Sequence, residues 1–233
     1  MKTVVCQLAL ALAFISLAEA QDREAPAMPT WEEKIAKGFV PHKQLTVEDF
    51  KIDDQAHRGS GYWVRPFMHP HWKYLTTWKD GWHYAYIVEW LVFSGFDKNE
   101  SSRKSKFTEM KQSLPFAQAY VDLYEIHSRQ LAALLPGELP SGRGATQDEA
   151  RVALEKNLDA FLKQRYQLLQ AETDALVKAT NRGVNEKKVL ELGKEIRKRL
   201  EAIPVSPKLS SDSKLATPAS SPTPEPIASP VSK

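Results

Sequence analysis

Hydrophobic positions follow a period of two in the first half of the chain, which predicts β-strands. Within residues 82–93 both alternating sets are largely apolar, as expected for a strand that is covered on both faces. The Asp80-Gly81 pair just before this strand tolerates the positive φ of a tight turn and predicts a β-hairpin. We expect the partner strands within residues 62–67 and 74–78.

The second half of the chain changes to the three- and four-residue spacing of amphipathic helices. Pro115 suits a first helical position, so we predict that the first long helix begins there. Pro136-Gly137 ends this helix and opens a Gly/Pro-rich loop over residues 136–146.

A second long helix is predicted from Gln147 to Ala179, with a third helix behind it. Thr146 and Glu149 have the spacing of a capping box, in which each side chain accepts a hydrogen bond from the backbone N–H near the other residue. Arg182-Gly183 ends the second helix, and Asn185 is expected to cap the third.

The two patterns predict an α+β fold, with a small antiparallel sheet within residues 45–93 followed by three helices. Sequences at both ends differ in character from this domain. The first twenty residues have the pattern of a secretory signal. Lys2 supplies its positive charge, an apolar stretch follows, and Ala18-Glu19-Ala20 forms a cleavage site near Ala20. The tail has seven prolines and eight serines among its thirty residues and no aromatic residue, which predicts disorder. The predicted parts are a signal peptide (1–20), a loosely docked leader with a short helix near 31–37 (21–44), the domain (45–203) and the tail (204–233).

The composition indicates where the protein is located more clearly than what it does. Cys6 is the only cysteine and leaves with the signal, so a periplasmic or secreted protein without disulfides is expected. The net charge is +3 with both signs interspersed, which does not favour a nucleic-acid partner. Beyond the signal no stretch reaches the ~20 apolar residues that a transmembrane helix needs. The oligomeric state is left open by these features.

The first long helix contains part of a known motif without its metal ligands. Residues 121–125, Val-Asp-Leu-Tyr-Glu, resemble the end of the motif H-E-Q-x-H-F-D-I-x-E in a bacterial family of unknown function described as secreted zinc-dependent proteases. In that family two histidines one turn apart bind Zn²⁺, and the glutamate between them activates water. The resemblance places Phe116, Ala117 and Tyr120 at these three positions, where none of them can ligate zinc strongly or act as a general base.

Two further segments resemble the same family. Residues 45–51, Leu-Thr-Val-Glu-Asp-Phe-Lys, are similar to its L-[ST]-W-x-D-F-K segment. Residues 180–185, Thr-Asn-Arg-Gly-Val-Asn, resemble its T-x-H-G-x-N segment, with Arg182 in place of a histidine. The resemblance covers about residues 45–202 and implies a zincin-like domain that has lost its metal site.

The same residues also have simpler explanations. An aromatic pair such as Phe116 and Tyr120, one turn apart on a buried face, is most often ordinary core. Asp122 and Glu125 match family positions that could orient metal ligands, but without ligands we expect them to be surface or capping residues. Both interpretations predict that this helix carries no catalysis.

Histidines offer the alternative chemistry. His69 and His71, with His83 and His57 nearby in sequence, could form a zinc site, because an H-x-H pair on a strand directs both rings to one face. Pro70 lies between the pair and argues against a regular strand, so loop histidines packed by aromatics are the simpler interpretation. We expect His127 to be a core or rim residue that donates to a carbonyl group rather than a ligand.

The function that these features favour is non-catalytic. We expect an exported protein, built on a metalloprotease-like scaffold, that binds a protein or peptide partner in the vacated cleft and needs no cofactor. Aromatic residues between Tyr62 and Phe93 could line such a groove for a peptide or a glycan. The alternatives are an active zinc hydrolase that uses His69, His71 and His83, and a structural envelope protein that oligomerises through an apolar seam on the helix from 147 to 179.

Overall fold

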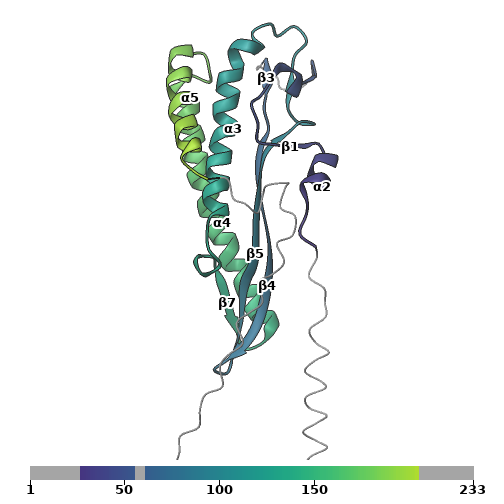
Figure 1. The fold of residues 1–233 in the computed structure, drawn as a ribbon, viewed down its shortest axis with the longest axis vertical. Helices are drawn as coiled ribbons and strands as arrows, with labels where there is room; N and C mark the ends of the chain where they lie inside the picture. Colours follow the sequence, from purple (N-terminus) through teal and green to yellow (C-terminus); the bar gives the residue numbers. More distant parts are fainter. Residues whose placement is uncertain (1–26, 56–60, 205–233) are drawn as a thin grey trace, which may run out of the picture.

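A long β-hairpin forms the centre of the fold (Figure 1). The computed structural model describes residues 27–55 and 61–204 of the chain. Strands β4 (Pro66–Lys79) and β5 (Trp82–Asp97) run antiparallel over their whole length and join at Asp80 and Gly81. Both turn residues have positive φ, 52° and 81°, which confirms the predicted hairpin turn. The fold is α+β, as predicted.

Strand β5 is the central strand of the larger sheet. Strand β4 pairs with one of its edges, while β1 (Phe39–Pro41) and β7 (Ser141–Gly144) pair with the two ends of its other edge. A second, smaller sheet contains β2 (Lys51–Ile52), β6 (Ser102–Arg103) and β3 (Tyr62–Trp63). Its β2–β6 pair is parallel, so the sheets are not purely antiparallel.

Strand β4 is continuous where the sequence predicted a loop and two shorter strands. It passes through Pro70, which pairs with Val92 of β5, and its register shifts only between Lys73 and Tyr74. Among the described residues no strand pairs with the other edge of β4. A proline is tolerated on an edge strand because its missing N–H breaks no ladder on the open side. The prediction of an irregular segment around Pro70 is therefore wrong.

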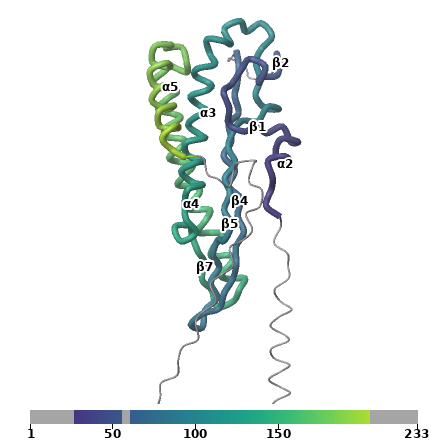
Figure 2. The backbone as a smooth tube through the Cα atoms, viewed as in Figure 1, coloured from purple at the N-terminus to yellow at the C-terminus, as the bar shows by residue number. Residues whose placement is uncertain are grey.

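Three long helices lie on one side of the hairpin, where the first two pack on it and the third packs on the first, and the short helix α2 (Trp31–Ala36) lies on the other side (Figures 1 and 2). The long helices are α3 (Met110–Ala132), α4 (Gln147–Ala179) and α5 (Glu186–Glu201). Two 3₁₀ turns, η1 (Val47–Asp49) and η2 (Pro136–Glu138), precede α3 and β7. The predicted bounds of α4 are confirmed, whereas α3 begins before Pro115 and includes it.

The caps explain why the helices begin where they do. The Thr146 side chain accepts from the Glu149 N–H, and the Asn185 side chain accepts from the Lys188 N–H. Each such cap stabilises a helix by about 1 kcal/mol. The Glu149 carboxylate accepts from the N–H of Ala145 rather than from that of Thr146, so only half of the predicted capping box is present.

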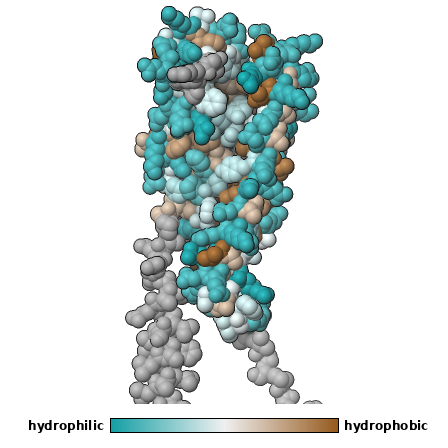
Figure 3. Space-filling model, turned by 180° about the vertical axis from the view of Figure 1, so that it is seen from behind, coloured by the Kyte–Doolittle hydropathy of each residue, from teal (hydrophilic) through white to brown (hydrophobic). Residues whose placement is uncertain are grey.

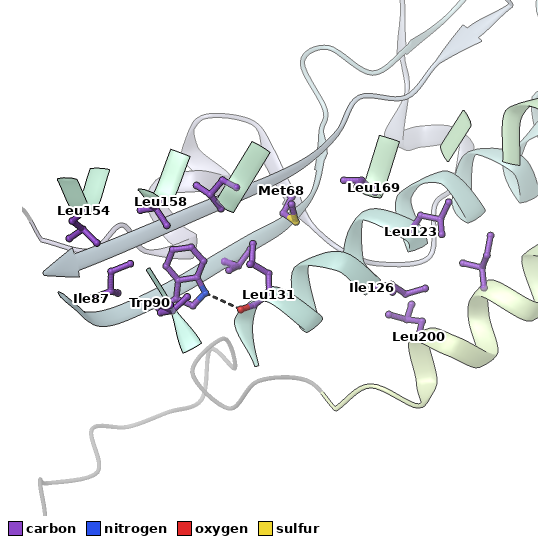
Figure 4. Packing of buried hydrophobic residues seen from close by; sticks show 14 of the residues in the cluster. Met68, Ile87, Trp90, Leu123, Ile126, Leu131, Leu154, Leu158, Leu169 and Leu200 are labelled. Atoms are coloured by element: carbon purple, nitrogen blue, oxygen red, sulfur yellow. Dashed lines mark hydrogen bonds between the residues drawn. The ribbon is translucent and has the colours of Figure 1, made fainter. Parts of the chain in front are cut away.

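The main core lies between the inner face of the hairpin and the three helices (Figure 4). Trp90 of β5 is buried there, and its indole N–H donates to the carbonyl oxygen of Leu131 at 3.0 Å. Leu123 and Ile126 of α3 pack toward Leu200 of α5. Burying each such side chain contributes about 1.5–3 kcal/mol, which makes this interface the main source of stability.

The segment before the predicted domain is part of the fold. Trp31 of α2 packs edge-on against Phe93, with ring centroids 4.9 Å apart, and β1 adds a strand to the larger sheet. The short helix predicted near residues 31–37 is present as α2, and β1 and Trp31 attach this segment to the larger sheet. The predicted signal peptide, His57 and all but the first residue of the predicted tail lie outside the described residues.

The face of the molecule opposite to that in Figure 1 is mostly polar, with apolar side chains scattered over it (Figure 3). Helix α4 buries its apolar stripe against the chain itself, and its exposed large apolar residues are Val152, Tyr166 and Leu168. Val152 lies far in sequence from the other two, so these residues do not form a continuous seam along the helix. In residues 27–55 and 61–204 no helix is long and apolar enough to cross a membrane.

Candidate functional site

Helix α3 presents the aromatic residues of the degenerate motif on one stripe. Phe116 and Tyr120 stack with centroids 6.4 Å apart, and Tyr124 continues the stripe 5.8 Å from Tyr120. All three are partly buried against the main core. The interpretation of Phe116 and Tyr120 as a packed aromatic pair is confirmed.

Ala117 occupies a different surface of the helix. Its side chain is 0% exposed and belongs to a second core cluster with Leu45, Phe50 and Phe96. A carboxylate at this position would be buried among apolar groups and would cost several kcal/mol without a partner. Restoring a glutamate here would therefore require further changes around the helix.

The turn between α4 and α5 lies against Phe116. A Cβ atom at Gly183 would be 3.0 Å from Cγ of the Phe116 ring, and Gly183 itself has a φ of 90°. Buried Thr180 holds the turn, because its hydroxyl accepts from the Gly183 N–H and donates to the carbonyl of Leu176. Arg182 is exposed, with a positive φ of 58°. The segments that resemble the family's two histidine-bearing motifs are thus neighbours in space.

A groove of about 460 Å³ opens beside Tyr120, between the edge of β4 and helices α3 and α4. We call it the tyrosine groove, because Tyr120, Tyr124 and Tyr166 line one side of it. Its other walls come from β1, the start of β4 and the loop after β5; the remaining lining residues used below are Trp63, Arg65, Phe67 and His69.

Burial raises the pKa of two of the tyrosines in this groove. It raises the pKa of Tyr124 to about 12, with a further contribution from Tyr120, and it also raises the pKa of Tyr166. The Tyr166 hydroxyl donates to the carbonyl oxygen of Met68 on β4 at 2.5 Å. Arg65 brings a cation to the rim, where it pairs with Glu100 at 3.4 Å. The groove thus offers neutral hydroxyl groups, aromatic faces and one guanidinium group, together with the carboxylates of Asp97 and Glu100.

Asp122 is the centre of a buried polar network, which corrects the prediction of a surface residue. It is 1% exposed, and its carboxylate lies 2.7 Å from Nε2 of His42, 2.6 Å from Nε2 of Gln118 and 3.3 Å from Nε of Arg197. Burial alone would raise the pKa of Asp122, but the hydrogen bonds from His42 and Gln118 and the charges of His42 and Arg197 outweigh it and lower the pKa. The network ties the leader segment and α5 to α3.

Glu125 is a structural residue as well. Its carboxylate accepts from the hydroxyl of Ser94 on β5 and from Nε of Arg129 at 2.7 Å. Arg129 in turn donates to the carbonyl oxygens of Leu200 and Ile203 at the end of α5. Glu125 therefore holds Arg129 in the position from which Arg129 caps the end of α5, which agrees with the predicted role of Glu125 as a capping partner.

The three histidines of the alternative zinc site do not meet. His69 and His71 share the outer face of β4, packed among Phe39, Phe67 and Phe93. His83 pairs with Trp78 beside the turn, whereas His71 pairs with Leu91. At about 3.3 Å per residue along β5, His83 lies roughly 26 Å from His71 and roughly 33 Å from His69, which pairs with Phe93. The prediction that His69, His71 and His83 form one site is therefore wrong.

His71 makes stability depend on pH. Burial, followed by the charges of Lys34 and His69, lowers the pKa of His71 from 6.5 to about 4. An unfolded chain takes up this proton below pH 6.5 but the folded chain does not, so folding becomes less favourable as pH falls from 6.5 to about 4. We expect His71→Gln to lose less unfolding free energy than the wild type between pH 7 and 4.5 in urea titrations. Identical pH slopes for the two proteins would contradict this assignment.

His127 lies in the core, as predicted, but beside a carboxylate rather than a carbonyl group. It is 8% exposed, and its Nε2 is 3.4 Å from Oε1 of Glu172 without the geometry of a hydrogen bond. Burial lowers its pKa, although Glu172 acts in the opposite direction. In the part of the chain that the structure describes, no group of three or more His, Cys, Asp or Glu side chains is placed to hold a metal ion.

Comparison of the chain with protein-family models, with curated proteins and with solved structures finds no match. The resemblance to secreted zinc-dependent proteases therefore stays a prediction that rests on the sequence segments. Sequence reasoning missed Tyr166, because its isolated position on α4 gives no signal of a partner on β4. It also missed Arg65, which pairs with Glu100 at the rim of the tyrosine groove. His42 and Arg197 were missed for the same reason, because their contacts with Asp122 join segments that are remote in sequence.

Proposed function

We propose that this protein is an exported, non-catalytic binding protein on a metalloprotease-like scaffold, and that the tyrosine groove holds an extended peptide segment of a protein partner. The observation that carries the proposal is the position of Tyr120. It replaces a metal ligand in the motif that the helix resembles, and its ring lines a groove of about 460 Å³. Aromatic side chains at a vacated ligand position offer binding surface and no water-activating group.

The contacts around the resembling segments support the same scaffold. The Leu45 N–H donates to Gln118 of α3 at 2.6 Å, and Gly183 packs on Phe116 of the same helix. The three segments that carry the resemblance therefore converge on α3. In an active relative these are the segments from which ligands and their supporting residues would come.

An extended peptide fits the groove better than a compact ligand. The groove follows the start of β4, whose outer edge pairs with no strand among the described residues. Along this edge Pro66 and Pro70 have no N–H, and the carbonyl oxygen of Met68 already accepts from Tyr166, so the extended peptide would be held by side-chain contacts rather than as a fully paired added strand. Tyr120, Tyr124 and Phe67 would then take an aromatic or aliphatic side chain of that peptide, and Arg65 would meet a carboxylate.

Selection from a phage-displayed library of random peptides against the mature protein tests the proposal. We expect a recurrent motif with an apolar or aromatic residue and an acidic residue, bound with a micromolar Kd in fluorescence anisotropy. Trp63→Ala and Arg65→Ala should each weaken the selected peptide by about tenfold. Leu135→Ser, at an exposed residue outside the groove lining, is the matched control and should bind as the wild type does.

The proposal would be contradicted if the selected peptides bound Trp63→Ala, Arg65→Ala and the wild type with the same Kd. Zinc retained by the purified mature protein near one equivalent would overturn the non-catalytic assignment in a separate measurement. A monomer that stays monomeric over a wide concentration range would argue against the structural alternative of a helical oligomer.

A further inference from the structure

A second groove of about 460 Å³ lies on the other side of α3, between this helix and α5. We call it the lysine groove. Its floor is apolar and includes Leu114, Pro115 and Ala119 of α3 and Val189 of α5. Leu190, which is 55% exposed, stands at its rim. The groove therefore combines exposed apolar surface with an elongated shape between two helices.

Positive charge surrounds this floor. Lys111, Lys194 and Lys198 line the groove, and within the described residues none of them forms an ion pair. Arg197 also lines it, held toward Asp122 and Gln44 at 3.3 and 3.1 Å. The carboxylates of the lining are Asp122, which is already paired, and Glu201. An unneutralised cluster of lysines over an apolar floor favours an anionic amphipathic partner.

Gly193 lies in the middle of α5 and lines the same groove. A glycine inside a helix weakens it, because the residue loses more conformational freedom on folding than any other. No turn or neighbour requires this glycine, since a Cβ atom there would meet nothing within 4 Å. What the glycine does provide is a low point on the helix, where the backbone of another element can approach closely.

Pro115 adds an acceptor to the opposite wall. It lies inside α3 and has no N–H, so the carbonyl oxygen of Lys111 lacks its α-helical donor. Lys111 and Pro115 both line the groove. A partner side chain with a donor group can therefore bond to the backbone of α3 at the same place where its carboxylates meet the lysines.

We infer that the lysine groove binds an acidic amphipathic helix of a partner protein, independently of the tyrosine groove. Leu190, Gly193 and Arg197 follow one another at three- and four-residue intervals along α5, the spacing with which one helix meets another, and Lys194 lies directly after Gly193. Apolar residues of the incoming helix lie over Gly193 and Leu114, and its acidic residues pair with Lys111, Lys194 and Lys198. A second copy of this basic chain lacks the required net charge.

A designed peptide is the probe for this site. It has about 20 residues in a helical pattern, with leucine on one face and glutamate on both flanks. A counterpart replaces every glutamate with lysine. We expect the acidic peptide to bind the mature protein with a micromolar Kd that weakens as salt is added, and the basic counterpart to show no binding.

Variants at Gly193 separate groove binding from general attraction. Gly193→Trp fills the open space above the helix and should weaken the acidic peptide by at least about tenfold. Gly193→Ala adds only a methyl group at the same place: it should weaken the peptide much less than Gly193→Trp does and should melt at a higher temperature than the wild type, since alanine favours helix. Lys194→Glu should also weaken the peptide at low salt. If Gly193→Trp does not fold, by circular dichroism, Gly193→Leu takes its place.

Four results would overturn the inference. The acidic peptide could bind Gly193→Trp and Gly193→Leu as tightly as the wild type, or the basic counterpart could bind equally well. Vesicles of anionic phospholipid could bind while the acidic peptide does not, which would assign the groove to a membrane surface. Finally, sedimentation could reveal a dimer that Gly193→Trp dissociates, with no peptide binding, which would assign the groove to self-association.

Discussion

Asp122→Asn is expected to lower the free energy of unfolding by about 2 kcal/mol at neutral pH. Removing one partner of a buried ion pair costs about 3–5 kcal/mol, because the other partners keep their desolvation cost. The effect is smaller here, since the side chain of Arg197 is 43% exposed and regains water. Gln118 is buried and the side chain of His42 is only 17% exposed, so these two partners account for most of the loss. Urea titration of both proteins, monitored by circular dichroism, measures this difference in unfolding free energy.

The stability difference between the wild type and Asp122→Asn should also depend on pH. Because the folded pKa of Asp122 is lowered, its contribution is complete above the ordinary value of 3.8 and is lost as pH falls through the folded value. The stability difference between the wild type and Asp122→Asn should therefore narrow only below about pH 4. Asp159→Asn, at an exposed position of α4, is the control and should change stability by less than about 0.5 kcal/mol. A wild-type-like Asp122→Asn would refute the network's role.

Local signals explain which parts of the fold could be predicted from the sequence. The bounds of α4 and the cap of α5 follow from apolar spacing and from Thr146 and Asn185, all of which act within a few residues. Pro115 predicts a helix that begins at that residue, but the apolar packing of Met110 extends α3 before it. Tertiary burial outweighs the loss of one helical hydrogen bond there.

Asp122 illustrates what sequence patterns cannot supply. Its position on α3 was matched to the degenerate motif, but its partners His42 and Arg197 lie 80 and 75 residues away in the chain. Nothing local distinguishes a buried aspartate with three partners from one that faces solvent. The tyrosine groove was predicted only in part for the same reason, since Tyr120 belongs to the motif and Tyr166 approaches it only through tertiary packing.

Helix α3 is the element on which both proposed binding sites depend. Consecutive residues of this helix line different grooves: Ala119 contributes to the lysine groove and Tyr120 to the tyrosine groove. Buried Ala117 and Gln118 fix the helix to the segment around Leu45. If both proposals hold, α3 would present one aromatic and one cationic groove and could hold two partner segments at once.

Strand β7 leads to the largest stability effect that we expect. The sequence around it was interpreted as a Gly/Pro-rich loop, yet residues 141–144 form a strand in which exposed Ser141 and Arg143 alternate with buried Gly142 and Gly144. Both glycines face α4. A Cβ atom at Gly142 would lie 2.1 Å from the carbonyl oxygen of Ala150 and 2.3 Å from the backbone nitrogen of Leu154.

Gly142→Ala is therefore expected to destabilise the protein by about 4 kcal/mol, at the upper end of single substitutions. The clash is with helix backbone, so no side-chain rotation relieves it; α4 must move away from β7 and from the main core. Gly137→Ala is the matched control, because a Cβ atom there meets nothing within 4 Å, and it should leave stability within about 0.5 kcal/mol of the wild type. Urea unfolding of both variants decides the matter: equal midpoints would mean that β7 does not pack on α4 as described.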